Sequence, residues 1–358
     1  MKKVFETHLH YIQKVPLRES VQLFKKCFAL YNAQKYIFLS FPNNGQSKVN
    51  DLTQNVKGLY YKHAFNGDGY AYAGLEHHFL DKDADSNDFY NQIKEYHSVG
   101  FDGIKMYEGH PHMYKLSGYS LDDVVYDKFF DYAEKEGIPL TMHLGNDPSF
   151  WDKDKISDYW RYVRNCYFDE TFPSIDKQYQ DLFRVLDRHP NLKYTLAHFG
   201  FFSDKYDYAE KFMSYKNTMV DLTPGGNQII NMGNNHDLWK PFLKKYSHKI
   251  KFGCDNYNFY CGDEKEWEKT ELLRPTLIKN FFETNTEHVY NNQTFKGIGA
   301  DEEMISKIYF DNAQNELGSP KEIDLDYVIN RAKSLQEVYS PDTLNGYDLK
   351  CIIDDIKK

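Results

Sequence analysis

Two histidines near the start of the chain stand two residues apart, in the run 6–10 that reads Glu-Thr-His-Leu-His. Successive side chains of a β-strand point to opposite faces, so His8 and His10 would present both imidazoles to the same side. Two imidazoles that converge on one point can chelate a metal ion. The pair alone also fits two hydrogen-bonded core histidines, so a metal site requires further ligands.

Three more polar residues each end a short apolar segment. They are His143 in the run 138–145, His198 in the run 192–200 and Asp255 in the run 250–257, and a Gly or Asn follows each of them closely. Polar groups that gather at the C-terminal ends of parallel strands are typical of the active site of an α/β barrel. Five such residues in this order rarely arise by chance, and the sequence therefore predicts a metal site.

The elements that would position these residues are short apolar strands that alternate with longer helical patterns. This alternation indicates βα units around a parallel sheet, and eight units fit the chain. The predicted fold class is α/β, a (β/α)8 TIM barrel with a C-terminal helical extension. We expect strands over 4–11, 35–42, 69–77, 101–107, 138–145, 192–200, 218–224 and 250–257, and helices over 21–34, 88–98, 121–136, 177–188, 207–215, 238–244 and 264–282.

No repeat or linker divides the chain, so we expect a single barrel over residues 1–318. Residues 319–358 are expected to form helices that pack on the barrel or on a second subunit, which would make the protein a homodimer. The segment 146–175 is long for a loop after a strand, and such loops shape a substrate pocket or act as a lid.

Composition excludes several partners. The 358 residues carry a net charge of −9, and no cluster of Lys and Arg has the density that a phosphate backbone would require. Five Cys without a CxxC pair argue against a disulfide framework or a thiolate zinc site. No run approaches the roughly 20 apolar residues of a membrane span, and the first residues do not read as a signal peptide. We expect a cytoplasmic protein that binds a small-molecule substrate, with no nucleic acid or membrane partner.

Short motifs recur at the ends of the predicted strands. They are Glu-Thr-His-Leu-His at 6–10, Gly-Ile-Lys at 103–105, Met-His-Leu-Gly at 142–145, Ala-His-Phe-Gly at 197–200, Phe-Gly-Cys-Asp at 252–255 and Asp-Asn-Ala-Gln at 311–314. Through them, residues 1–318 resemble the amidohydrolase superfamily, and within it the amidohydrolase-related group that includes aminocarboxymuconate-semialdehyde decarboxylase and resorcylate decarboxylase. That group commonly has Asp before HxH and Gly-Ser-Asp at the eighth strand, where this chain has Glu6 and Cys254; neither change removes a ligand.

The resemblance implies metal ligands at His8, His10, His143 and Asp255, with His198 as a second-metal ligand or a transition-state stabiliser. Imidazole and carboxylate ligands suit Zn²⁺, the cofactor expected first, and also Mn²⁺ or Fe²⁺. Asp255 would touch the metal, accept the proton of a bound water and pass it to the leaving group. His198 would orient or polarise the substrate oxygen.

Lys105, at the end of the fourth predicted strand, has three open roles. It could be carbamylated and bridge two metals, as in two-metal members of the superfamily, or it could hold a substrate carboxylate. It could also form an ion pair with Glu76 or Asp221 inside the barrel.

Other polar and aromatic residues are candidates for substrate binding. Arg161 and Arg164, beside two tryptophans, could clamp an anionic substrate or face solvent on the loop. His110 and His112 follow the fourth strand, and we expect them to be exposed to solvent. The remaining candidates are Glu76, Tyr107, Asn146, Asp147 and Trp151.

Three functions fit these residues, because fold and ligands fix the metal but not the reaction. The predicted one is a metal-dependent hydrolase that acts on an amide, ester, lactone or C–C bond of a small, carboxylated or cyclic substrate. The second is a lyase that decarboxylates an aromatic or muconate-like acid, with Asp255 delivering a proton to carbon as CO₂ leaves. The third is a barrel that binds a ligand without turning it over.

Overall fold

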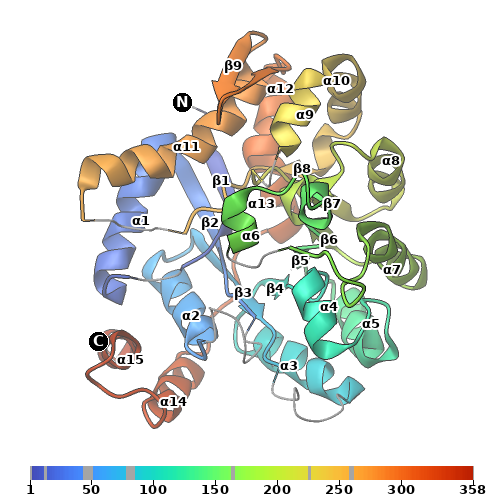
Figure 1. The fold of residues 1–358 in the computed structure, drawn as a ribbon. Coiled ribbons are helices and arrows are strands. Elements are labelled where there is room, and N and C mark those ends of the chain that lie inside the picture. Colours follow the sequence, from blue (N-terminus) through green and yellow to red (C-terminus); the bar gives the residue numbers. More distant parts are fainter. Residues whose placement is uncertain are drawn as a thin grey trace.

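The computed structural model describes residues 2–11, 14–42, 51–77, 85–162, 166–224, 227–257 and 262–357. Eight parallel strands form one sheet in chain order, and the helices surround it (Figure 1). The segment after the eighth strand bonds back to the first, since Asp255 N donates to His8 O and His10 N donates to Asn256 O, both at 2.9 Å. The predicted (β/α)8 barrel is therefore confirmed. Its strands are β1 (Val4–Leu9), β2 (Ala33–Leu39), β3 (Gly69–Gly74), β4 (Gly103–Met106), β5 (Leu140–Met142), β6 (Tyr194–Leu196), β7 (Thr218–Asp221) and β8 (Ile250–Lys251).

Long helices follow the strands, and most of them bury one apolar face on the barrel. In α7 (Ile175–Arg188) the Ser174 hydroxyl caps the first turn, and Tyr179, Leu182 and Leu186 form the buried stripe. The other helices of the outer ring are α1 (Leu17–Tyr31), α2 (Gln54–Ala64), α3 (Ser86–Ser98), α5 (Asp127–Glu136), α8 (Tyr206–Ser214), α10 (His236–Lys245) and α11 (Glu264–Glu283).

Shorter elements complete the fold between these helices and after them. They are α4 (Pro111–Ser117), η1 (Val124–Tyr126), η2 (Pro148–Trp151), α6 (Asp158–Tyr162), η3 (Ala197–Phe201), α9 (Gln228–Asn234), η4 (Ser247–Lys249), the hairpin β9 (Glu287–Tyr290) and β10 (Gln293–Lys296), α12 (Glu302–Ser306), η5 (Lys307–Asp311), α13 (Asn312–Leu317), α14 (Leu325–Leu335) and α15 (Leu344–Ile356).

One end of the barrel is closed by aromatic and aliphatic side chains. Phe5 on β1 packs against Tyr70 of β3 and Phe310 of η5, with ring centroids 5.1 and 5.9 Å apart. Asn312 Nδ2 donates to Ser247 O and Ile250 O at the start of β8, both at 2.7 Å. The N-terminal end of the barrel is thereby filled, and the polar ends of the strands lie at the other end.

Among the elements that were not expected are helix α2 and the hairpin β9–β10. Helix α2 is buried along most of its length, so it lacks the alternation of apolar and polar faces that identifies a helix in a sequence. The hairpin β9–β10 turns at Asn291 and Asn292, both with positive φ, and this pair of residues was a usable turn signal.

The C-terminal helices pack on the barrel. In Figure 1, α14 and α15 (red) lie beside α2, and an ion pair of 3.0 Å joins Lys57 Nζ of α2 to Asp348 Oδ2 of α15 with both side chains buried. The division at residue 318 and the homodimer stay predictions. None of the described helices combines the length and hydropathy that a membrane span requires.

Candidate metal centre

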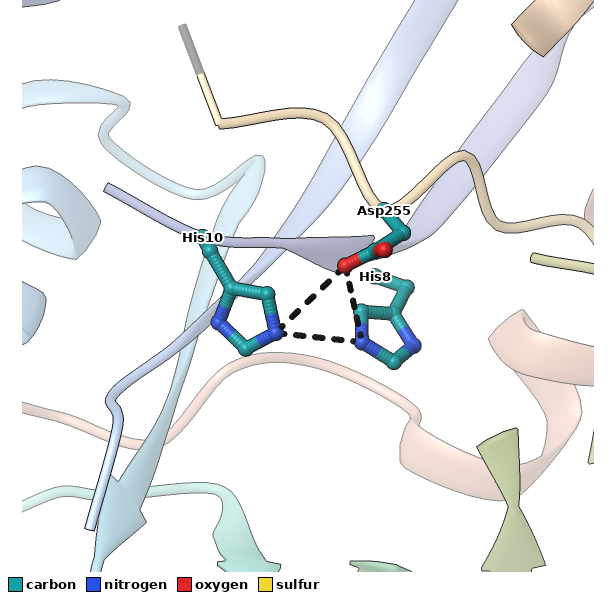
Figure 2. Close-up of side chains that lie close together, drawn as sticks. All are labelled: His8, His10 and Asp255. Carbon is teal, nitrogen blue, oxygen red and sulfur yellow. Dashed lines mark hydrogen bonds and ion pairs between the residues drawn. The ribbon is translucent and has the colours of Figure 1, made fainter. Parts of the chain in front are cut away.

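Three of the predicted ligands meet where β1 and β8 end (Figure 2). His8 Nε2 lies 3.2 Å from His10 Nε2, and Asp255 Oδ1 lies 3.6 and 3.7 Å from those two nitrogens. All three side chains are buried. Within the described part of the chain, this is the one group of three or more His, Cys, Asp or Glu whose ligand atoms all lie within 4.8 Å of one another, and it could bind a divalent metal.

The remaining nitrogens of the two histidines are held by other groups. His8 Nδ1 lies 2.7 Å from Asp221 Oδ2, and His10 Nδ1 lies 2.9 Å from Leu39 O. A carboxylate or carbonyl on one ring nitrogen places the proton there and leaves the other nitrogen with its lone pair. Both Nε2 atoms are thus oriented toward the same point as ligands, and this donor set fits a divalent metal.

Burial keeps the imidazoles neutral. It lowers the pKa of His8, His10 and His143 well below the usual value and lowers the pKa of His198 to about 4. The same burial raises the pKa of Asp255 to about 6, against the opposing charges of Arg274 and Lys105. Neutral imidazoles are the form in which histidine binds a metal.

Glu6 joins the two strands that carry the ligands. Its buried carboxylate accepts hydrogen bonds from His8 N at 3.0 Å and from Cys254 N at 2.8 Å. Burial raises the pKa of Glu6 to about 7. The two positions at which the chain departs from the amidohydrolase-related pattern, Glu6 and Cys254, are therefore in direct contact.

His143 and His198 form a second pair beside the first. His198 Nε2 lies 3.2 Å from His143 Nδ1, and His198 N donates to Asp221 Oδ1 at 2.9 Å. His143 Nε2 and His198 Nδ1 are buried and have no hydrogen-bond partner within the described residues. His143 stands outside the three-residue group, and its role as a fourth ligand stays a prediction.

Lys105 lies next to the three-residue group. Its Nζ is 3.4 Å from His8 Nε2, and burial lowers its pKa to about 8. Glu76, one of the two ion-pair partners suggested for Lys105, accepts from Arg331 Nη2 of α14 at 3.3 Å. Glu76 thus connects the rim of the barrel to the C-terminal extension.

Three candidates after β4 and β5 hold the rim loops together. Tyr107 stacks on His110 with ring centroids 4.3 Å apart, and its ring lies 5.3 Å from that of His143. Asn146 Nδ2 donates to the hydroxyl of Tyr167 at 2.9 Å, and that hydroxyl lies 3.2 Å from His110 Nε2. His110 is buried, so the expectation that solvent surrounds it was wrong.

The candidates on the long loop after β5 face other loop residues. Asp147 Oδ1 accepts from Ser149 N at 3.0 Å and caps η2. Trp151 Nε1 donates to Pro173 O at 2.9 Å. Arg161 lies on the exposed helix α6, where it bonds to Lys153 O. Arg164 lies outside the described residues.

Sequence reasoning did not identify Arg274, whose Nη1 is 3.3 Å from Asp255 Oδ2. It lies in the middle of α11, which the sequence marks only as a helix of the outer ring. No local sequence pattern distinguishes Arg274 from the other charged residues of that helix.

Residues 85–224 match the family model of the amidohydrolases. No curated protein matches the sequence. Among solved structures, a candidate amidohydrolase from Staphylococcus aureus has 14% identity and a TM-score of 0.51, over 88% of this chain and 99% of its own. The 4-oxalomesaconate hydratase of Rhodopseudomonas palustris has 12% identity and a TM-score of 0.51, over 94% and 99%. A dihydroxybenzoic acid decarboxylase from a Polaromonas species, with bound manganese and 2-nitroresorcinol, has 11% identity and a TM-score of 0.50, over 88% and 97%.

At these identities the solved structures are alike in fold. The family match and the shared barrel confirm the resemblance that the strand-end motifs indicated, which is to the amidohydrolase superfamily.

Proposed function

We propose that this protein is a metal-dependent hydrolase of the amidohydrolase type, acting on an amide, ester, lactone or C–C bond of a small, carboxylated substrate. The main support for the proposal is that His8 Nε2, His10 Nε2 and Asp255 Oδ1 converge at one end of the barrel. The Nδ1 atoms of both histidines are already hydrogen-bonded to other groups.

The ligands favour Zn²⁺, with Mn²⁺ and Fe²⁺ as alternatives. A divalent cation bound there would supply a Lewis acid and lower the pKa of water. Asp255 accepts a proton from the attacking water while the water oxygen bonds to the substrate carbonyl carbon. The same carboxyl group then returns the proton to the leaving nitrogen, oxygen or carbon.

We propose that His198 orients the substrate. Its main-chain N–H is fixed by Asp221, and its buried Nδ1 lacks a hydrogen-bond partner among the described residues. A neutral imidazole in this position can hydrogen-bond the substrate oxygen as charge develops on it.

Decarboxylation is the second candidate, and the position of Lys105 favours it. The ammonium group lies 3.4 Å from His8 Nε2, where it could hold a substrate carboxylate next to the ligands. A similar barrel is that of a dihydroxybenzoic acid decarboxylase with bound manganese. In this reaction Asp255 would give its proton to the ring carbon as CO₂ leaves.

Turnover of two substrate panels distinguishes the candidates. Protein supplied with Zn²⁺ or Mn²⁺ is assayed with esters, lactones and amides, and separately with hydroxybenzoic and muconate-like acids for CO₂ release. Hydrolysis without CO₂ supports the first candidate, and CO₂ release supports the second. Asp255→Asn should reduce either turnover by about 10²- to 10⁴-fold, because it removes the proton carrier.

Asp122→Asn is the matched control, because that carboxylate lies on the outside of the barrel, paired with Arg184. It should leave turnover unchanged. Ligand binding without turnover in both panels would contradict both enzymatic candidates and leave the binding barrel.

A further inference from the structure

Arg274 reaches from α11 to the loop after β8 and contacts Asp255 in two ways. Its Nη1 donates to the main-chain carbonyls of Asp255 and, at 3.3 Å, of Cys254. The same nitrogen lies 3.3 Å from Asp255 Oδ2. One guanidinium nitrogen therefore touches the backbone and the side chain of a predicted ligand.

The backbone at this position needs such support. Asp255 has a φ of 54°, in the left-handed region that residues with a Cβ rarely adopt. A residue held there is strained and stays only where surrounding contacts fix it. On one side, Asp255 N donates to His8 O at 2.9 Å. On the other side, Arg274 Nη1 donates to the carbonyls of Cys254 and Asp255.

The two oxygens of the Asp255 carboxylate face different neighbours, and the carboxylate also accepts a hydrogen bond from the Tyr257 side chain. Oδ1 faces His8 Nε2 and His10 Nε2, at 3.6 and 3.7 Å, whereas Oδ2 faces Arg274. With Oδ2 held by a charged donor, rotation of the carboxylate is restricted. Oδ1 then remains directed toward the two histidines.

The local surroundings strengthen this contact. The Arg274 side chain is two-thirds buried, 32% exposed, and its guanidinium carbon lies 5.9 Å from the ring centroid of Tyr257. Ion pairs away from bulk water are screened less by solvent than surface pairs. The contact with Asp255 is thus a structural feature of the site and not a surface pair.

We propose that Arg274 is a positioning residue of the candidate metal centre, which fixes the left-handed backbone at Asp255 and thereby directs Asp255 Oδ1 toward His8 and His10. This inference rests on the proposed metal site and adds a residue that neither motif nor family match assigns.

Metal affinity of the full chain tests the proposal without relying on activity. Dissociation constants for Zn²⁺ and Mn²⁺ are measured by competition with a chromophoric chelator. Arg274→Met should weaken binding by about tenfold or more, because Asp255 is no longer directed at the histidines. Arg274→Lys keeps a charged donor on a shorter side chain and should restore part of the loss.

Two further readouts separate positioning from a general effect on folding. Co²⁺ bound to Arg274→Met should show a visible spectrum changed in the same direction as that of Co²⁺ bound to Asp255→Asn, since the carboxylate is misdirected in the first variant and absent in the second. In the Asp255→Asn background, Arg274→Met should change the affinity by less than about twofold. Lys269→Met, at an exposed position of the same helix, is the matched control and should bind as the wild type does.

Each outcome decides a separate question. Wild-type protein that binds neither Zn²⁺ nor Mn²⁺ would contradict the proposed function, and the inference with it. Wild-type binding together with unchanged affinity in a folded Arg274→Met would overturn only the positioning role. If Arg274→Met does not fold, Arg274→Gln, which keeps a neutral donor, decides by the same affinity criterion.

Discussion

Each ligand side chain of the candidate metal centre is held by a second polar group, at an atom other than the one that faces the metal site. Asp221 holds His8, the carbonyl of Leu39 holds His10, and Arg274 contacts Asp255. Groups behind the ligands typically affect metal affinity by about 10- to 100-fold. The geometry of the site therefore depends on residues that touch no metal.

Asp221→Asn should weaken metal binding by about 10- to 100-fold. The amide of Asn would donate to His8 Nδ1, so the ring proton would move to Nε2 and block the nitrogen that faces His10. Chelator competition measures the effect, with Asp122→Asn as the control. Equal affinities of Asp221→Asn and wild type would show that the tautomer of His8 is not set by Asp221.

The residues that could be predicted are those whose spacing is tied to a strand. His8 and His10 share a strand face, and Asp255 ends an apolar run, so each was identified from local pattern. Arg274 and Arg331 reach the rim from helices, and nothing local distinguishes them from other helical arginines. Their partners became visible only when the fold placed α11 and α14 next to the strand ends.

At the scale of elements, buried ion pairs join helices to strands around the barrel. Lys62 of α2 donates to Asp102 Oδ2 at 2.8 Å, and that carboxylate also accepts from Ala71 N of β3 at 2.9 Å. Both charged side chains are buried. The pair fixes α2 against β3 and β4, which the sequence could not predict because α2 shows no amphipathic pattern.

Lys62→Met should lower the free energy of unfolding by about 3–5 kcal/mol, because it leaves the Asp102 charge buried without its cation. Urea unfolding at pH 7 measures the change. The Lys26–Glu264 pair is exposed, so Lys26→Met is the control and should stay within about 0.5 kcal/mol of the wild type. A loss below 1 kcal/mol for Lys62→Met would contradict the role of the pair.

The destabilisation by Lys62→Met should depend on pH. Burial raises the pKa of Asp102, and loss of Lys62 raises it further. A carboxyl group whose pKa is raised on folding stabilises the folded state at pH values below its unfolded pKa, which is about 3.9. That contribution disappears as the pH rises through the folded pKa. The difference between variant and wild type should therefore be smaller at pH 4 than at pH 7. A larger difference at pH 4 would contradict this sign.

At the scale of the whole molecule, the C-terminal helices pack against the barrel. Lys57 of α2 contacts Asp348 and Asn345 of α15, and Arg331 of α14 reaches Glu76 at the rim. The sequence predicted helices beyond residue 318 but not the face on which they pack. The helix that they cover, α2, lacks a solvent-exposed face that would have marked it.

Lys57→Met should destabilise the chain by about 3–5 kcal/mol, because Asp348 would remain charged in a buried position. The double variant Lys57→Met with Asp348→Asn should recover most of this loss, since it removes both charges and keeps an acceptor for Leu17 N. Thermal and urea unfolding of the full chain measure both. A double variant that is less stable than Lys57→Met would contradict the ion pair as the cause.

The proposed function depends on a divalent metal held by His8, His10 and Asp255. Anomalous diffraction from crystals of the full chain soaked with Zn²⁺ or Mn²⁺ tests it most directly. We expect one strong anomalous peak within bonding distance of His8 Nε2, His10 Nε2 and Asp255 Oδ1, and its loss in His8→Ala. A metal bound elsewhere, or an empty site in crystals whose soaking solution saturates the wild-type protein, would contradict it.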